Sequence, residues 1–196
     1  MSSTLVRQAL RGVAAAAPGT LAMDAALYRA YRRGGGDAAF PKWESSEGVV
    51  SWDGAPAPAL LAKRLLEGVL GHDLSPHYAR PLNNATHWGF GLSAGAGYGL
   101  LVGSRHKPSV WYGLPFGAAV WGFGYVVLPL FGVYKPIWQY DLETLGKDLG
   151  AHLVFGTTTA AAWRLLPPVH SWPSKRHAAH ASTRKASTSA ANSAWC

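Results

Sequence analysis

Four ionisable residues fall inside long segments that otherwise carry little charge: Asp24, His87, Asp148 and His152. An ionisable side chain in a membrane-spanning helix faces the bundle interior or water, and it often marks a proton or ion pathway. Asp148 and His152 are four residues apart, which places them on one face of a helix. The set predicts a polar intramembrane cluster, and a carboxylate–imidazole relay is the chemistry that it could perform.

Two other interpretations of these residues stay open. His87 and His152 could lie at the depth of the membrane interface, with Asp148 solvated and Asp24 bonded to a neighbouring helix. The second interpretation is a metal site with mixed nitrogen and oxygen ligands. Only Asp148 and His152 have the local spacing of metal ligands, which makes this interpretation weaker. We therefore predict no catalytic residue, no bound metal and no cofactor.

Glycine recurs at every fourth residue in the second long apolar segment. In a soluble helix each interior glycine costs about 0.8–1.0 kcal/mol relative to alanine. Between membrane helices the same spacing allows close packing. The predicted packing positions are Gly91, Gly95, Gly99 and Gly103, with Gly113 and Gly117 in the next segment. His87 lies four residues before Gly91, so it continues the same every-fourth-residue series. If the glycines face the other helices, His87 faces them too.

The distribution of charge and tryptophan predicts the fold class. Charged residues are only 14% of the chain and crowd between the apolar segments, and most of the nine tryptophans lie at the segment edges. That placement is typical of an interfacial aromatic belt. We predict an all-α integral membrane protein, a four-transmembrane-helix bundle with spans at 12–31, 86–104, 111–134 and 149–166. The first span is the weakest, because Asp24 at mid-helix costs about 2.5–3.5 kcal/mol on insertion scales.

The segments outside the spans have distinct characters. Residues 1–11 form an N-terminal basic segment, and residues 58–70 form an amphipathic helix that lies on the membrane surface or packs on the end of the bundle. Between these two segments, we predict that the acidic residues Glu44, Glu47 and Asp53 lie on the solvated face of a loop. Residues 167–196 are rich in Ser, Ala and basic residues without periodicity, which predicts a disordered basic tail.

The net charge of +8 would suggest a nucleic-acid partner in a soluble protein. Here basic residues beside apolar spans set topology and contact anionic lipid headgroups. An even number of spans puts both termini on one side, and we predict that this side is the cytoplasm. The expected partners are the lipid bilayer, anionic headgroups at the tail, and a second copy or another membrane protein, with no nucleic acid. A cleaved signal peptide over residues 12–23 is the alternative for the first span.

Three stretches carry a resemblance to a known family. They are residues 24–36 (DAALYRAYRRGGG), residues 83–88 (NNATHW), and residues 134–141 (YKPIWQYD) leading into 147–152 (KDLGAH). On these stretches the chain resembles small bacterial multi-pass inner-membrane proteins of unknown function, and it is broadly similar to YagU-like proteins. The resemblance covers roughly residues 10–166. It implies a location in the inner (plasma) membrane and brings no catalytic residues.

Three functional hypotheses follow. The first is a small multi-pass membrane protein that acts by helix association, as a self-assembling bundle or accessory subunit. The second is a proton or small-ion transporter or channel that uses Asp24 with His87 and His152. A membrane enzyme is the third and the least favoured. Convergence of the three residues around a cavity would favour transport or chemistry, whereas scattering over different helix faces would leave association.

Overall fold

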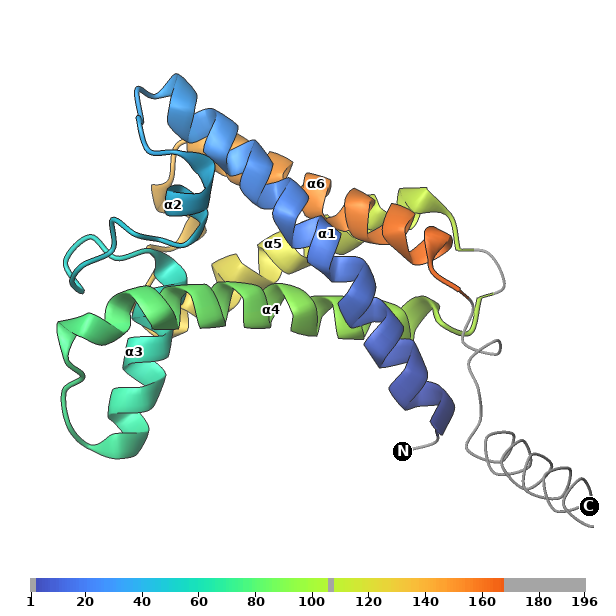
Figure 1. Cartoon of the computed structure of the whole chain (residues 1–196), viewed down its shortest axis with the longest axis horizontal. Helices are drawn as coiled ribbons and strands as arrows, with labels where there is room; N and C mark the ends of the chain where they lie inside the picture. The colour runs from blue at the N-terminus through green and yellow to red at the C-terminus, as the bar shows by residue number, and fades with distance from the viewer. Residues whose placement is uncertain (1–2, 106–107, 168–196) are drawn as a thin grey trace, which may run out of the picture. The chain divides into compact units, whose positions relative to one another are not determined.

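The computed structural model describes residues 3–105 and 108–167, and this part of the chain is helical without strands. Four long helices dominate it: α1 (Ser3–Arg33), α4 (Ala79–Val102), α5 (Gly113–Leu130) and α6 (Leu142–Leu165). The short α2 (Phe40–Glu44) and α3 (Ala57–Leu70) lie in the connection between α1 and α4 (Figure 1). Single 3₁₀ turns at Pro76–Tyr78, Val110–Tyr112 and Ile137–Gln139 precede the last three long helices. The all-α fold class is confirmed.

The helix ends follow local sequence signals. Asp141 caps α6, because the backbone N–H of Thr144 donates to its Oδ1 at 2.7 Å. Gly71, in the left-handed conformation at φ 71°, ends α3 at the end of the predicted amphipathic segment. The predicted basic segment 1–11 is not separate from the bundle, since most of it forms the first turns of α1. The predicted tail lies outside the described residues, apart from Pro167.

One segment of the described chain, Val110–Leu130, is long and apolar enough to cross a membrane by length and composition alone. The prediction of four spans is therefore not confirmed by this criterion. Polar residues lower the mean hydropathy of the other long helices: α1 carries Asp24 and several arginines, and α6 carries Lys147, Asp148 and His152. Such an average gives inward-facing and outward-facing residues the same weight.

Contacts among the long helices run in the order α4–α1–α6–α5. Helix α1 packs against both α4 and α6, and α6 packs against α5. In Figure 1 α1 crosses both α4 and α6. One end of the bundle contains the start of α1, the connection from α4 to α5 and the end of α6. We call this the terminal end. The opposite end, with the connections 34–78 and 131–141, is the loop end.

Small residues bring the helices together. A methyl group added at Gly95 would collide with Ala16 and with the backbone of Gly12, and one at Gly99 with the backbone of Gln8. Across α5 and α6, a methyl group at Gly113 or Gly117 would meet the backbone of Gly156 or His152. Gly91 and Gly103 likewise lie against α1, at Thr20 and Gln8. All six predicted packing glycines thus lie at contacts within this chain.

Aromatic rings fill the terminal end. The ring of Tyr98 lies 4.8 Å from that of Phe116 and 6.0 Å from that of Trp163. Ala15 of α1 is fully buried beside Tyr98 and Trp163. Arg11 donates through Nη2 to the carbonyls of Trp163 (2.6 Å) and Leu166 (2.9 Å), and its guanidinium lies 4.1 Å from the Trp163 ring centre. Arg11 therefore satisfies carbonyls at the C-terminal end of α6.

Candidate functional site

Asp24 belongs to a buried stripe along α1. The stripe consists of residues at three- and four-residue spacing: Gln8, Gly12, Ala15, Ala16, Gly19, Thr20, Met23 and Asp24. Residues at this spacing share one face of a helix. That face contacts α4 and α6, so the carboxylate of Asp24 is held inside the protein, and the residue is only 3% exposed.

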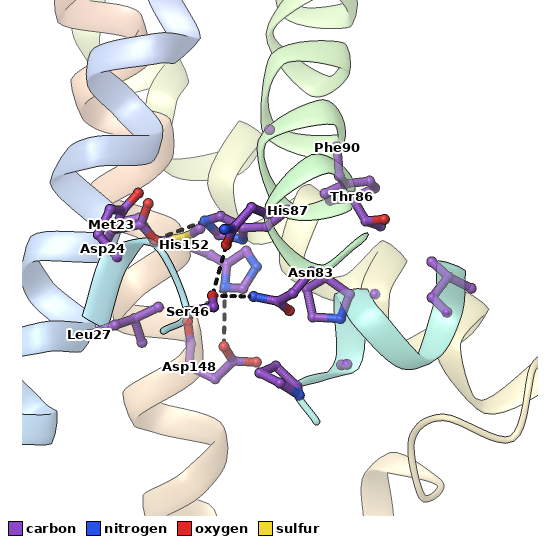
Figure 2. A pocket seen from close by; sticks show the side chains of 18 of the residues that line it. Met23, Asp24, Leu27, Ser46, Asn83, Thr86, His87, Phe90, Asp148 and His152 are labelled. Carbon is purple, nitrogen blue, oxygen red and sulfur yellow. Dashed lines mark hydrogen bonds and ion pairs between the residues drawn. The ribbon is translucent and has the colours of Figure 1, made fainter. Parts of the chain in front are cut away.

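His87, on the third turn of α4, is the partner of Asp24. The imidazole Nε2 lies 2.9 Å from Asp24 Oδ1, and Figure 2 shows the two side chains pointing toward one another. With a proton on Nε2 the imidazole donates to the carboxylate, either as a neutral hydrogen bond donor or as an imidazolium in an ion pair. Within the described residues the second carboxylate oxygen, Oδ2, is buried and has no hydrogen bond partner.

Glu44, at the end of α2, also lies at this site. The Nε1 of Trp88 donates to Glu44 Oε1 at 3.1 Å. Burial raises the pKa of Glu44 above its ordinary value, and the negative charge of Asp24 raises it further. The prediction that Glu44 belongs to a solvated loop face is therefore wrong, although the exposed Asp53 fits it.

Aromatic packing brings α2 back onto α1. The ring of Tyr28 lies 5.2 Å from that of Phe40 and 5.5 Å from that of Trp43. The hydroxyl of Tyr28 donates to the carbonyl of Ala38 at 2.9 Å. These contacts hold the chain after α1 in a reversal, which carries Glu44 from a remote sequence position to the level of Asp24.

An amide–hydroxyl network fixes the following loop to α4. Asn83 donates through Nδ2 to Ser46 Oγ at 2.7 Å, and that hydroxyl donates to Asn84 Oδ1 at 2.8 Å. Asn84 donates in turn to the carbonyl of Ser45 at 2.9 Å. Ser46 has φ 53°, a left-handed conformation that is uncommon for a non-glycine residue. Asn83 and Asn84, adjacent residues near the start of α4, thus both hold the loop through their side-chain amides.

Asp148 and His152 form a second pair on α6. His152 Nδ1 lies 2.8 Å from the backbone carbonyl of Asp148 and 3.4 Å from its carboxylate Oδ1. No hydrogen bond joins this pair to Asp24 and His87 in the described part of the chain. The predicted cluster is thus two carboxylate–imidazole pairs on different helices.

Both pairs line one cavity of about 730 Å³ at the loop end. Its walls come from α1, α4, α5 and α6, with the 38–49 segment and the start of α3. The rings of Phe90 and Phe123 stack at 6.0 Å between α4 and α5. A mainly apolar cavity of this size with a few converging polar groups is typical of small-molecule sites.

Sequence reasoning missed three contributors to the site: Glu44, Ser46 and Asn83. A signal for Asn83 exists, because it lies four residues before His87 and so shares its helix face. Nothing local in the sequence indicates that the 38–49 segment returns to α1 and α4.

The donor set does not form a metal site in the described chain, where no three His, Cys, Asp or Glu residues are placed to hold an ion. Comparisons with protein-family models, with curated proteins and with solved structures gave no match. The resemblance to YagU-like membrane proteins therefore stays a prediction from the sequence.

Proposed function

We propose that this chain is a four-span inner-membrane protein, with both termini in the cytoplasm, that transports protons or a proton-linked small ion. The observation that carries the proposal is the buried Asp24 paired with the partly buried His87 on the wall of a large cavity. A carboxylate in contact with an imidazole inside a helical bundle is a combination that proton pathways use.

Exposed apolar side chains support a membrane location beyond α5. On α5, Phe123, Val126 and Leu130 are 54%, 67% and 80% exposed. Leu10 and Leu21 of α1 are also exposed, as is Leu101 of α4. In water such surfaces are unfavourable when contiguous, whereas in a bilayer they face the lipid.

The buried position of the polar residues explains how α1 and α6 could span a bilayer despite low mean hydropathy. Thr20 and Thr159 are fully buried, and Asp24 nearly so. Intramembrane polar residues face the bundle interior or a cavity for this reason. With this topology the cavity opens toward the side opposite the termini, and the basic residues Arg11, Arg105 and Arg164 lie toward the cytoplasm.

Two further groups extend the proton chemistry. Glu44 offers a second carboxylate near Asp24, and the raised pKa of Glu44 favours its protonated form in the folded protein. The Asp148–His152 pair on α6 gives a further site in the same cavity. A proton that leaves His87 has acceptors within the same cavity, which a relay requires.

Helix association, the first functional hypothesis, loses its main support. The glycine stripe of α4 faces α1 of the same chain. These glycines already pack within the bundle, so they do not offer a packing surface to another chain. The exposed face of α5 remains, and lipid covers such a face without a protein partner.

Proton flux into liposomes tests the proposal. The full-length protein is reconstituted with a pH-sensitive dye inside, and flux under an imposed pH gradient and membrane potential is compared with that of Asp24→Asn. Asparagine keeps the size and a hydrogen bond acceptor but cannot ionise, so we expect flux to fall to the level of empty liposomes. Asp53→Asn, in an exposed loop, is the matched control and should retain wild-type flux. Equal flux in wild type and Asp24→Asn would contradict the proposal.

A further inference from the structure

The charge balance of the cavity is negative. Its lining carboxylates are Asp24, Glu44, Glu47 and Asp148, and its lining bases are Lys42, His87 and His152. No arginine is among the described residues that line it. Lys42 and Glu47, both well exposed, lie 3.6 Å apart and offset one another. Three carboxylates therefore face two imidazoles, and the balance is negative while the imidazoles are neutral, even with Glu44 protonated.

Two buried acceptors in the cavity wall have no donor. Asp24 Oδ2 and Asn83 Oδ1 lack hydrogen bond partners among the described residues, and both side chains are more than nine-tenths buried. A buried acceptor without a partner carries a desolvation cost of about 1–3 kcal/mol. A ligand that brings positive charge or N–H donors to this wall would remove that cost.

Aromatic rings make up much of the remaining wall. Trp43, Phe90, Trp121 and Phe155 line the cavity. The face of an aromatic ring attracts a cation within about 6 Å of its centre. Tyr31, Tyr125 and Tyr134 also line it and add further ring surface.

We propose that the cavity binds an apolar organic cation, such as a hydrophobic amine or quaternary onium ion, and that this cation is the ion exchanged for protons. The inference rests on the proposed function and names its substrate class. Carboxylates hold the positive centre, and the rings and aliphatic side chains hold the apolar groups. A proton and the cation then compete for the same carboxylates, Asp24, Glu44 and Asp148, beside which His87 and His152 lie.

Direct binding of two ions of the same shape tests this inference. Tetraphenylphosphonium and tetraphenylborate differ in the sign of charge, so their binding to the detergent-purified full chain separates charge from apolarity. We expect tetraphenylphosphonium to bind at pH 8 and to bind at least about tenfold more weakly near pH 5.5, a difference of about 1.4 kcal/mol. Tetraphenylborate should bind at least about tenfold more weakly than the cation at pH 8.

Variants locate the bound cation. Asp24→Asn should weaken tetraphenylphosphonium binding by about tenfold or more, and Asp53→Asn should leave it unchanged. Glu44→Gln keeps an acceptor for Trp88 and serves as a second variant in case Asp24→Asn does not fold, which size-exclusion chromatography would show. Glu44→Gln should also weaken binding and flatten its pH dependence.

The outcomes separate the substrate class from transport itself. Equal binding of the two tetraphenyl ions, or binding that neither Asp24→Asn nor Glu44→Gln changes, would overturn the organic cation even if proton flux depends on Asp24. Selective, Asp24-dependent binding of the cation would support it. If proton flux were then the same in wild type and Asp24→Asn, the transport proposal would be wrong while the binding site would stand.

Discussion

The terminal and loop ends of the bundle use the same helices in opposite ways. At the terminal end Gly12 and Ala16 of α1 lie against Gly95 of α4, so the two backbones touch. At the loop end the same two helices present Asp24 and His87, which meet only through their side-chain tips. The size of the residues on one stripe thus determines the separation of the helices. Close packing holds the fold at one end, and the other end is left wide enough for a cavity.

The largest expected effect comes from filling the close contact at the terminal end. Gly95→Leu would drive a side chain into the backbone of α1, and we expect a loss of about 3 kcal/mol or more. Gly97→Leu is the matched control, because Gly97 lies two residues away on α4 with open space at its Cβ position. Thermal unfolding in detergent measures both. Similar midpoints for the two variants would show that α1 and α4 do not touch along this stripe.

An intermediate effect is expected for Arg11→Met, which removes the cap on α6. Arg11 makes two hydrogen bonds to carbonyls, and charged hydrogen bonds contribute about 1.5–3 kcal/mol each. Methionine keeps part of the packing on Trp163, so we expect a net loss of about 2 kcal/mol. Arg29→Met, at an exposed position, should change the midpoint little. A comparable drop in both variants would mean that charge alone, rather than the cap, is responsible.

The smallest effect is expected at the loop end, from Glu44→Gln. Because the pKa of Glu44 is raised, folding favours the protonated form. Its contribution to stability is fully present below the ordinary glutamate pKa and is lost as pH rises through the raised value. Glutamine imitates the protonated form, so the variant should match wild type at low pH and become slightly more stable than wild type toward neutral pH.

Thermal midpoints across the pH range measure this difference. Glu143→Gln, which removes an exposed ion pair with Lys147, should show no such gain. A midpoint difference between Glu44→Gln and wild type that does not change with pH would place Glu44 in solvent, as the sequence predicted.

Local signals in the sequence predicted much of the framework. The predicted amphipathic helix, which is α3, and the predicted packing glycines depend on residue types within one or two helical turns. The cap that Asp141 forms on α6 is equally local. The inward position of Asp24 follows from the small residues that precede it at helical spacing. Such features are set by the helix itself, so a sequence pattern is enough to reveal them.

The rest of the site depends on contacts between distant segments. Glu44 approaches Asp24 only because Phe40 and Trp43 pack on Tyr28, and no periodic pattern connects these residues. The same limit applies to membrane crossing, where mean hydropathy selects one segment. Which polar residues point inward depends on the assembled bundle, and a one-dimensional average does not contain that information.

Proton release on cation binding tests the account most directly. The purified protein, in weakly buffered detergent near pH 7, receives tetraphenylphosphonium while the pH is followed with an indicator dye. If the cation and the proton share the Asp24–His87 site, wild type will release protons in proportion to the cation bound, and Asp24→Asn will release far fewer. Binding without proton release in wild type would contradict the account, because the cation and the proton would then occupy independent sites.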